Sequence, residues 1–549
     1  MRLLGKAVAA AAMAAACVSA VADEYHAKPK LVVILVLDQM RGDYLDRYRD
    51  DFKTANGFNL FLKKGAHFTD CYYDYANTHT APGHSTIGTG AYTDGHGIQA
   101  NQWWDFSRST EHVYSSVDDD DYKVVGAPVG ATITPGQSPR NLMASTLGDE
   151  IVLATHGEAK VFGISLKDRA AILTSGHATQ GAFWIDQKSG HFITSTYWMN
   201  DLPAYVAKFN ASGKAEAAAK EVGGKGQNFY NEVGATPAGI RYELEFAENV
   251  IDAEQLGKHA VTDMVTISLS STDILGHAVG PNDPKQRALL DGADIELDKF
   301  FTWLNTHVDG GMANVWVAMS GDHGVAPAVG ETQKLGMPAN TFSYAGLIDA
   351  MNEELTKKLS PGNPQKFLLQ GGEYAYFPLD QRVWEKLHMS EADAENMVAA
   401  MLPEVMAKTQ PGLPGSKPAS RPLVRRVFTK AQMASGNLPN NDLGRLLQHS
   451  YSPNGGWQVF ALFGEYQLPG AATGTTHYAP YSYDRHVPLD FYGSAFIPGT
   501  YHDRVAPVDI AATFASLLRI NQPSAAVGHV LTQILKPEVE PAAAAPRTK

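Results

Sequence analysis

The chain has 549 residues, of which 44% are hydrophobic and 19% are charged, a composition typical of a folded globular protein. Its formal net charge of -13 excludes the strongly basic surface with which proteins bind nucleic-acid duplexes. A small anionic substrate is not excluded, because bound divalent cations would reverse the local field.

Residues 1–22 are predicted to form a secretory signal peptide. Arg2 and Lys6 precede an Ala-rich apolar stretch, and Ala20-Val21-Ala22 fits the small-x-small cleavage pattern. A membrane anchor is disfavoured, because the apolar run is short for a spanning helix. Cleavage would leave Cys71 as the single cysteine, so no intramolecular disulfide could form. We therefore expect a periplasmic protein without a stable membrane anchor.

The rest of the chain predicts an α/β fold. Short apolar runs of the kind found in buried parallel strands occur at residues 31–37, 161–166, 264–269 and 315–320. Helical patterns follow several of them, at about 42–64, at 291–304 and at 508–518, where Pro507 marks the start of a helix. These patterns predict a mostly parallel central sheet flanked by helices.

The length exceeds one usual core, so we expect a catalytic core that carries two insertions. The predicted core comprises residues 23–330 and 470–535, with a first insertion at about 173–260 that includes a hairpin at 183–196. Composition changes after Gly330, where helical pieces alternate with Pro- and Gly-rich stretches, so residues 331–469 are predicted as a second insertion. The two insertions would form a smaller lobe over the site. The Pro- and Ala-rich residues 536–549 are predicted to be disordered.

Asp and His residues stand at the ends of the apolar runs, where α/β sheets bind their ligands. They are Asp38, Asp273, His277, Asp322 and His323, with His477 in a Thr-Thr-His segment near the C-terminus. Three carboxylates and three imidazoles indicate a two-metal site with mixed oxygen and nitrogen ligands, which suits zinc. Helix N-caps are the alternative for Asp38 and Asp273, and an exposed turn is the alternative for Asp322 and His323.

Thr80 is the candidate nucleophile. Residues 77–86 are typical of a loop entering a helix, with Thr80 at the N-cap and Pro82 in the first turn. A metal can deprotonate a hydroxyl at this position, and the amides behind it can hold a phosphoryl oxygen. The alternative is a Thr that only caps the helix. His84 falls inside the helix and is expected to be structural.

The order of these motifs resembles that of the alkaline phosphatase superfamily. They are Asp38, Thr80-Ala81-Pro82-Gly83-His84, Gly97-Ile98-Gln99-Ala100-Asn101, Asp273 with His277, Asp322-His323 and Gly474-Thr475-Thr476-His477. They are most similar to the branch that contains nucleotide pyrophosphatase/phosphodiesterases and the monomeric, Thr-nucleophile, phosphate-irrepressible alkaline phosphatases. The resemblance spans about residues 31–518 and implies the fold of that superfamily and a monomer.

By this resemblance, two zinc ions per subunit are expected. One would be bound by Asp273, His277 and His477, and the other by Asp38, Asp322 and His323, with the Thr80 oxygen beside it. Asn101 would donate a hydrogen bond to a phosphate oxygen. The family usually has Gly where this chain has Tyr478, so His486 remains an alternative to His477.

Lys167 and Arg169 bear on the substrate class. They follow the strand predicted at 161–166 and resemble a Lys-x-Arg pair that contacts the remaining oxygens of a phosphate monoester. A monoester carries one more negative charge than a diester, so this pair favours monoesters. A solvated surface pair is the alternative.

The expected function is therefore that of a zinc-dependent alkaline phosphatase, which hydrolyses small phosphate monoesters through a phosphothreonine. The alternatives are a phosphodiesterase of the same superfamily and a non-catalytic exported metal-binding protein. A sulfatase is disfavoured, because Thr80 stands where those enzymes need Cys or Ser. Residues 118–121 are four consecutive Asp, predicted as a solvated acidic loop, with calcium binding as the alternative.

Overall fold

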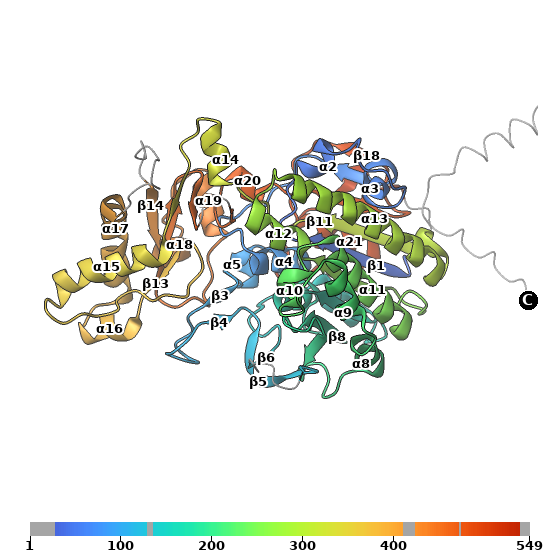
Figure 1. Ribbon diagram of the computed structural model, residues 1–549, viewed down its shortest axis with the longest axis horizontal. Coiled ribbons are helices and arrows are strands. Elements are labelled where there is room, and N and C mark those ends of the chain that lie inside the picture. Colours follow the sequence, from blue (N-terminus) through green and yellow to red (C-terminus); the bar gives the residue numbers. More distant parts are fainter. Residues whose placement is uncertain (1–27, 129–134, 410–422, 471–473, 538–549) are drawn as a thin grey trace, which may run out of the picture.

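The computed structural model describes residues 28–128, 135–409, 423–470 and 474–537 (Figure 1). The predicted signal peptide lies outside the described residues, as does the predicted tail from residue 538 onwards. Within the described residues, no helix has both the length and the apolar character that a membrane span requires.

Five parallel strands form the centre of an 11-stranded sheet. Their order is β11 (Val315–Ser320), β1 (Leu31–Leu37), β10 (Asp263–Leu269), β7 (Val161–Ser165) and β8 (Gly181–Ile185). One edge continues with β17 (Leu489–Tyr492), β2 (Ala66–Phe68) and β18 (Gly499–Tyr501). The other continues with β9 (Phe192–Ser195), β5 (Asp118–Val125) and β6 (Pro135–Gln137). The predicted α/β class is confirmed.

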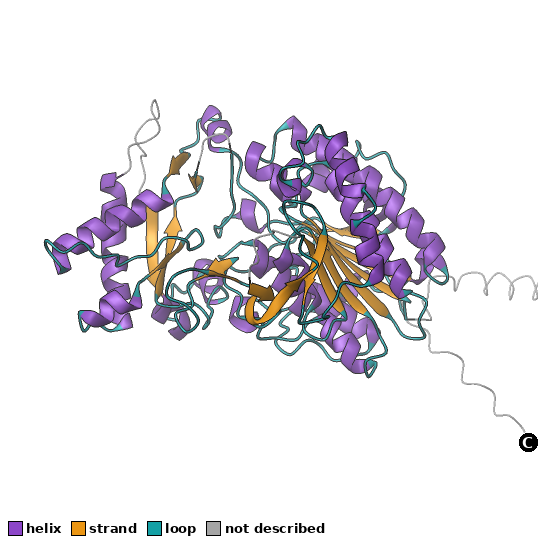
Figure 2. Cartoon of the chain, turned by 60° about the horizontal axis from the view of Figure 1, so that its bottom comes forward, coloured by secondary structure: helices purple, strands orange, loops and turns teal. Residues whose placement is uncertain are grey.

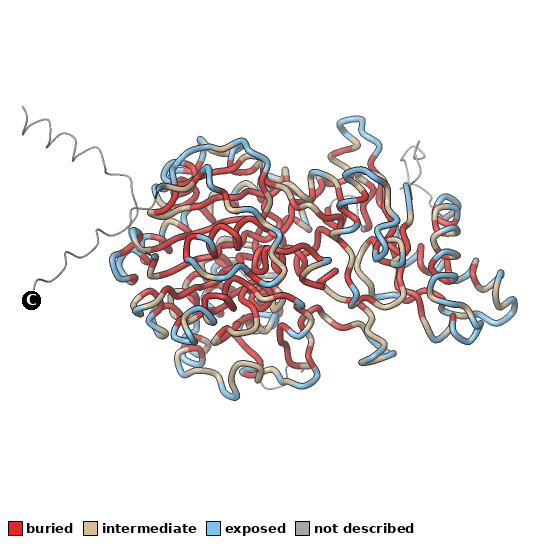
Figure 3. Tube along the Cα trace, turned by 180° about the vertical axis from the view of Figure 1, so that it is seen from behind, coloured by how far each residue is buried: buried red, intermediate tan, exposed pale blue. Residues whose placement is uncertain are grey.

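The side chains of β1 explain why helices cover both faces of the sheet. All seven are buried, and they alternate between the two faces as strand geometry requires. The odd-numbered residues join a core built with α11 (Pro237–Glu254) and α13 (Pro284–His307). The even-numbered residues join a second core built with α6 (Leu147–Ala154) and α21 (Asp509–Leu518). Figure 2 shows the helices on either side of the strands, and Figure 3 shows that buried residues gather in the centre of this body.

A smaller lobe lies beside this body, to the left in Figure 1. Its antiparallel sheet has the order β13 (Tyr376–Pro378), β15 (Gln458–Phe463) and β14 (Val424–Thr429). Two long helices, α15 (Tyr344–Leu359) and α17 (Glu391–Thr409), pack in the same unit. The lobe has a hydrophobic core of its own, to which residues 326–479 contribute nearly all members.

The shorter elements complete the two units. In the main body they are α2 (Tyr44–Arg47), α3 (Phe58–Lys64), α4 (Thr80–Thr89), α5 (Thr93–His96), β3 (Gln102–Trp103), β4 (Tyr114–Ser115), α7 (Asp168–Ser175), α8 (Ala204–Asn210), α9 (Lys214–Glu221), α10 (Phe229–Glu232), α12 (Ser271–Val279), η1 (Gly311–Asn314) and η2 (Thr532–Ile534). In and around the lobe they are α14 (Val329–Lys334), β12 (Asn340–Phe342), α16 (Gln381–Lys386), α18 (Lys430–Ser435), α19 (Asp442–Gln448), β16 (Gln467–Pro469) and α20 (Ser482–Arg485).

The two regions expected as insertions pack in different places. In residues 173–260 the predicted hairpin is present as β8 and β9, which extend the central sheet, and α11 packs on one face of that sheet. This region belongs to the main body rather than to the lobe, because its apolar residues have the sheet to bury against. Residues 331–469 build the lobe instead. The exact domain boundaries stay predictions.

Phe246 of α11 tests how firmly the 173–260 region belongs to the main core. Its ring stacks on Phe192 of β9 with 3.5 Å between the ring centroids, and both side chains are buried. We expect Phe246→Ala to lower the free energy of unfolding by about 3–5 kcal/mol, because it removes a buried ring from a packed core. Urea unfolding would measure the change.

The matched control is Leu153→Ala, whose side chain is 63% exposed and which should change stability by less than about 0.5 kcal/mol. Equal stabilities for the two variants would show that the region is only loosely attached.

Candidate active site

The carboxyl ends of four neighbouring parallel strands carry the charged residues of the site. In the order of the sheet, β11, β1, β10 and β7 are followed by Asp322, Asp38, Asp273 and Lys167. All four side chains are buried. Because parallel strands end at the same edge of a sheet, the topology alone forces three carboxylates and one ammonium together.

All six predicted metal ligands lie at this edge, and two groups within it have the geometry of a cation site. Asp38, Asp322 and His323 form one group, and Asp273, His323 and His477 form the other, with the ligand atoms of each group within 4.8 Å of one another. His277, the sixth, places Nε2 3.1 Å from Asp273 Oδ1. His323 takes part in both groups, because its ring stacks on His477 with centroids 3.4 Å apart. Which ion each residue would bind stays a prediction.

Each of the three imidazoles is oriented by a main-chain carbonyl group. Nδ1 of His277, His323 and His477 lies 2.9, 3.0 and 2.6 Å from a main-chain oxygen. A carbonyl oxygen can only accept, so Nδ1 carries the proton and the lone pair of Nε2 faces the carboxylates. Histidine ligands of metals are oriented in this way.

The electrostatics of the cluster favour cation binding. Burial raises the pKa of Asp38 well above its usual value, and repulsion from Asp273 and Asp322 raises it further. Burial also lowers the pKa of His323 to about 3, so its imidazole is neutral. Asp38 Oδ1 and Asp322 Oδ2 are buried and accept no hydrogen bond from the described residues. His277 differs, because the attraction of Asp273 outweighs burial and raises its pKa. A neutral imidazole and carboxylates with free lone pairs are forms that bind metal ions, so this donor set fits divalent cations.

Lys167 lies deeper than we expected from the sequence. Its Nζ is 2.5 Å from Asp38 Oδ2 and 2.6 Å from Asp273 Oδ2. Burial alone would lower the pKa of the ammonium, but the attraction of Asp273 and Asp38 outweighs it and raises the pKa. The Lys167 ammonium therefore links a carboxylate of each group. Because solvent does not reach this cluster, the ammonium and the two carboxylates stabilise one another instead.

Thr80 stands beside the cluster, at the start of α4. His79 is the N-cap, and Thr80 is the first residue of the helix, one position further in than the sequence indicated. Thr80 Oγ1 lies 3.5 Å from His323 Nε2. The next amide, of Ala81, donates to Asn101 Oδ1 at 2.9 Å. The hydroxyl and Asn101 thus meet at one helix terminus, where the helix dipole favours an anion.

Beside this terminus is a cavity of about 780 Å³, and it brings the three predicted substrate-binding residues together. Asn101, Lys167 and Arg169 all line it. Arg169 Nη1 lies 3.5 Å from the carboxylate of Asp168, while its Nε is buried and has no hydrogen-bond partner among the described residues. A guanidinium with an unused donor can bind an oxyanion.

Sequence reasoning missed Gln39, which ties two of the carboxylates together. Gln39 adopts a left-handed backbone conformation, with φ of 62°, directly after Asp38. Its main-chain N–H donates to Asp322 Oδ1 at 2.9 Å, and its side-chain Nε2 donates to Asp273 Oδ1 at 2.6 Å. Gly276 leaves room for it, since a Cβ there would lie 2.0 Å from Gln39 Oε1. The signal that could have identified Gln39 is its position, as a polar residue immediately after the Asp that ends a strand.

Sequence reasoning also missed Glu373, which reaches the cavity from the lobe. The chain places it almost 300 residues from Thr80, and nothing around it forms a motif.

Two other histidines lie near the site without joining either group. His486, the alternative to His477, stacks on Tyr72, and its Nε2 lies 3.1 Å from the carbonyl oxygen of Thr69. The geometry therefore favours His477 as the ligand. The ring nitrogens of His84 contact the Thr80 carbonyl oxygen at 2.9 Å and Ser268 Oγ at 2.7 Å, and its Nδ1 also lies 3.3 Å from Asp322 Oδ2. These contacts fit a structural role.

The four consecutive Asp residues do not form the loop that we expected. Residues 118–121 open strand β5, which pairs with β6 and β9. Asp119 contacts Arg140 and Asp120 contacts Arg108. Arginine side chains, rather than a metal ion, pair with these carboxylates. The two candidate cation groups found among the described residues both lie elsewhere.

Comparisons with known proteins place the chain among phosphate-ester hydrolases. The model of a family described as type I phosphodiesterase / nucleotide pyrophosphatase matches residues 32–377. Alkaline phosphatase PafA of Elizabethkingia meningoseptica is 32% identical, over 92% of this chain and 95% of the relative. Alkaline phosphatase PhoV of Synechococcus elongatus is 30% identical, over 93% and 94%. The crystal structure of wild-type PafA superposes with a TM-score of 0.81 at 31% identity and covers 93% of this chain and 100% of that one.

Gly83 tests whether the packing of α4 sets the geometry of the cluster. A Cβ at this position would lie 2.1 Å from the carbonyl oxygen of Asp322, so Gly83→Ala must push the helix and Asp322 apart. We expect the affinity for Zn²⁺ to fall by about 10- to 100-fold, the loss typical of disturbed supporting contacts around a metal. Isothermal titration calorimetry on the folded variant would measure it.

Gly456→Ala is the control, because its nearest heavy atom would be 3.5 Å away. Unchanged zinc affinity in Gly83→Ala would mean that the approach of α4 does not matter for the ligands.

Proposed function

This chain belongs to the type I phosphodiesterase / nucleotide pyrophosphatase family, and from its site we propose that it is a zinc-dependent alkaline phosphatase. In this proposal two zinc ions per subunit assist the hydrolysis of phosphate monoesters through a phosphothreonine on Thr80. The observation that carries it is the convergence of three carboxylates and three oriented imidazoles beside one buried hydroxyl.

The proposed ligands are those expected from the sequence. Asp273, His277 and His477 would hold one ion, and Asp38, Asp322 and His323 the other. Zinc bound there would promote loss of the Thr80 proton and neutralise charge that develops on the phosphate oxygens. The mixed nitrogen and oxygen donors support zinc over magnesium or calcium, which prefer all-oxygen sites.

In the proposed reaction, Thr80 Oγ1 forms a bond to phosphorus as the bond from phosphorus to the alcohol oxygen breaks. The alcohol leaves with a proton. Water then attacks the phosphothreonine and releases inorganic phosphate and the free hydroxyl. The position of Thr80 at the start of α4 supports this role, because the helix terminus stabilises negative charge on the transferred group.

Asn101, Lys167 and Arg169 are proposed to bind the oxygens that do not react. All three line the cavity next to Thr80. We infer that the ammonium of Lys167 turns to the phosphate when Asp38 and Asp273 act as metal ligands. Two cationic side chains and a donor amide suit a dianion, which supports monoesters over diesters.

The remaining expectations belong to the same proposal. The substrates would be small phosphate esters rather than nucleic-acid duplexes, and the protein would act as a monomer in the periplasm. The acidic net charge of -13 supports the first of these points.

The nucleophile is tested by Thr80→Ala. We expect kcat with p-nitrophenyl phosphate to fall at least about 1,000-fold, because removal of a nucleophile leaves only the binding contributions of the site. Zinc content, measured by atomic emission, should stay near two ions per chain. Thr89→Ala, at the far end of the same helix, is the control. Near-native turnover without the Thr80 hydroxyl would refute the mechanism.

The substrate class is tested by the double variant Lys167→Ala, Arg169→Ala. We expect kcat/KM for p-nitrophenyl phosphate to fall by about 100-fold or more, because hydrogen bonds to charged groups are lost. The smaller rate with bis-p-nitrophenyl phosphate should change much less. Lys225→Ala, on the surface, is the control. A wild-type preference for the diester, with little effect of the double variant on it, would favour a phosphodiesterase instead.

A further inference from the structure

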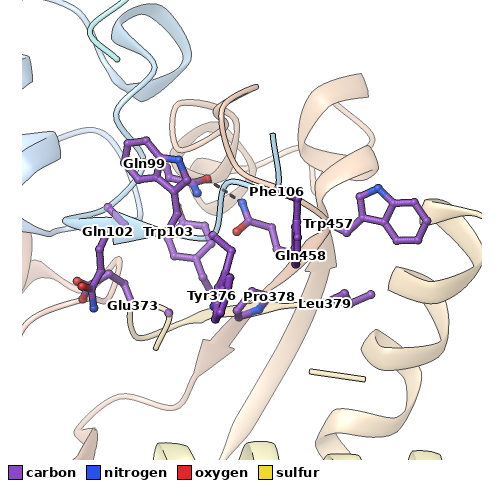
Figure 4. Close-up of a pocket in the computed structure, with 14 residues that line it drawn as sticks. Gln99, Gln102, Trp103, Phe106, Glu373, Tyr376, Pro378, Leu379, Trp457 and Gln458 are labelled. Carbon is purple, nitrogen blue, oxygen red and sulfur yellow. Dashed lines mark hydrogen bonds between the residues drawn. The ribbon is translucent and has the colours of Figure 1, made fainter. Parts of the chain in front are cut away.

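The cavity that Asn101, Lys167 and Arg169 line is bounded by residues of the main body and by one residue of the lobe. Glu373 precedes β13 and, of the residues that line the cavity, is the one that the lobe supplies. It also lines a narrow aromatic pocket between the two units, together with Gln102 (Figure 4). Like Glu373, Gln102 lines both the cavity and the aromatic pocket. A carboxylate and an amide therefore stand at the point where the lobe closes over the site.

Glu373 differs from the other acidic residues of the cavity in having no hydrogen-bond donor. Asp118, Asp168 and Asp186 each accept a hydrogen bond from a nearby main-chain N–H. Within the described residues the Glu373 carboxylate accepts none, and its closest basic neighbour, His79 Nδ1, is 3.9 Å away, too far for a hydrogen bond.

Burial makes this isolation costly. The Glu373 side chain is only 17% exposed, and removal from water raises the pKa of its carboxyl to about 7 despite the nearby charges of Arg169 and His277. A desolvated carboxylate without a donor gains more from a cationic partner than an exposed one does. The cavity thus offers an acceptor that nothing in the described protein uses.

The phosphate-binding residues determine what that partner is. Asn101, Lys167 and Arg169 line the same cavity as Glu373. In the proposed complex these three residues take the phosphate, which leaves the Glu373 carboxylate to contact the alcohol portion of the ester. A second anionic group on that alcohol would be repelled by the carboxylate. An ammonium group would receive a charge-assisted hydrogen bond from it.

We propose that Glu373 selects phosphate monoesters whose alcohol carries an ammonium group, an inference that rests on the proposed phosphatase function. Glu373 is then a specificity-determining residue, and Gln102 Oε1 is a second acceptor beside it. Because the ammonium is remote from phosphorus, the contact is the same in the ground state and the transition state. It should therefore lower KM with little effect on kcat.

Three esters of matched size test this proposal: O-phosphoethanolamine, ethyl phosphate and 2-phosphoglycolate, which carry a positive, a neutral and a negative end. They are compared on the zinc-loaded wild type and Glu373→Gln at about pH 9, where the carboxylate is ionised. Glu373→Gln should raise KM for phosphoethanolamine roughly tenfold, leave ethyl phosphate within about twofold and lower KM for phosphoglycolate. Glu465→Gln, an exposed glutamate of the lobe, is the control.

The possible outcomes separate the two proposals. An equal change with all three esters would overturn selection by charge, and so would no change at all. Glu373→Asp, which keeps the charge, should retain part of the preference, whereas a purely structural role would make it resemble Glu373→Gln. If the wild type hydrolyses none of the esters, the phosphatase function fails. Calorimetric titration of zinc-loaded Thr80→Ala with the same three esters would then still report whether Glu373 ranks their affinities.

Discussion

Repulsion among three buried carboxylates is the constraint on which the rest of the site depends. Asp38, Asp273 and Asp322 follow adjacent parallel strands, so the pairing of those strands brings the segments that carry them to the same edge of the sheet. Burial and repulsion from Asp273 and Asp322 raise the pKa of Asp38, and cationic or donor groups of the protein satisfy only some of the carboxylate oxygens. Lys167 links two of the carboxylates, and Gln39 donates to two of them. Two bound divalent cations would neutralise the remaining charge, so metal binding would also stabilise the folded state.

The imidazoles connect this edge of the sheet to distant parts of the chain. His477 follows the lobe, yet its Nδ1 contacts the carbonyl oxygen of Thr78, just before α4. His277 is held in the same way by the carbonyl oxygen of Thr475. These two imidazoles are thus oriented by segments that carry other candidate site residues, so a disturbance of one segment would reach the other imidazole. Such mutual support is what keeps a catalytic constellation within a few tenths of an ångström of its working geometry.

The sequence predicted the parts of this site that are locally encoded. An apolar run followed by Asp38, or by Asp322 and His323, predicts both a buried strand and a polar residue at its end. Both predictions come from consecutive positions of the chain, so no distant contact is needed to make them. Gln39 was missed because its role needs a left-handed backbone and the space left by Gly276, neither of which a pattern shows. The sharing of His323 by both groups depends on how its ring stacks on His477. Residues 118–121 were expected in a loop because their charges suggested solvent, whereas arginines from other segments allow them to start a strand. In each of these cases the outcome depends on contacts with residues distant in the sequence, which local patterns do not contain.

If Glu373 acts as proposed, the division of the cavity between two units separates chemistry from selection. In the proposed mechanism, the residues that bind phosphate and most of those that bind cations come from strand ends and helix termini of the main body. Glu373 reaches the same cavity from a lobe with its own hydrophobic core and its own sheet. A substitution in the lobe can therefore change what the alcohol must carry while the carboxylates, imidazoles and Thr80 keep their positions. The same sheet edge can then serve different esters, because functional variation accumulates in elements that contact the substrate without supporting the reacting groups.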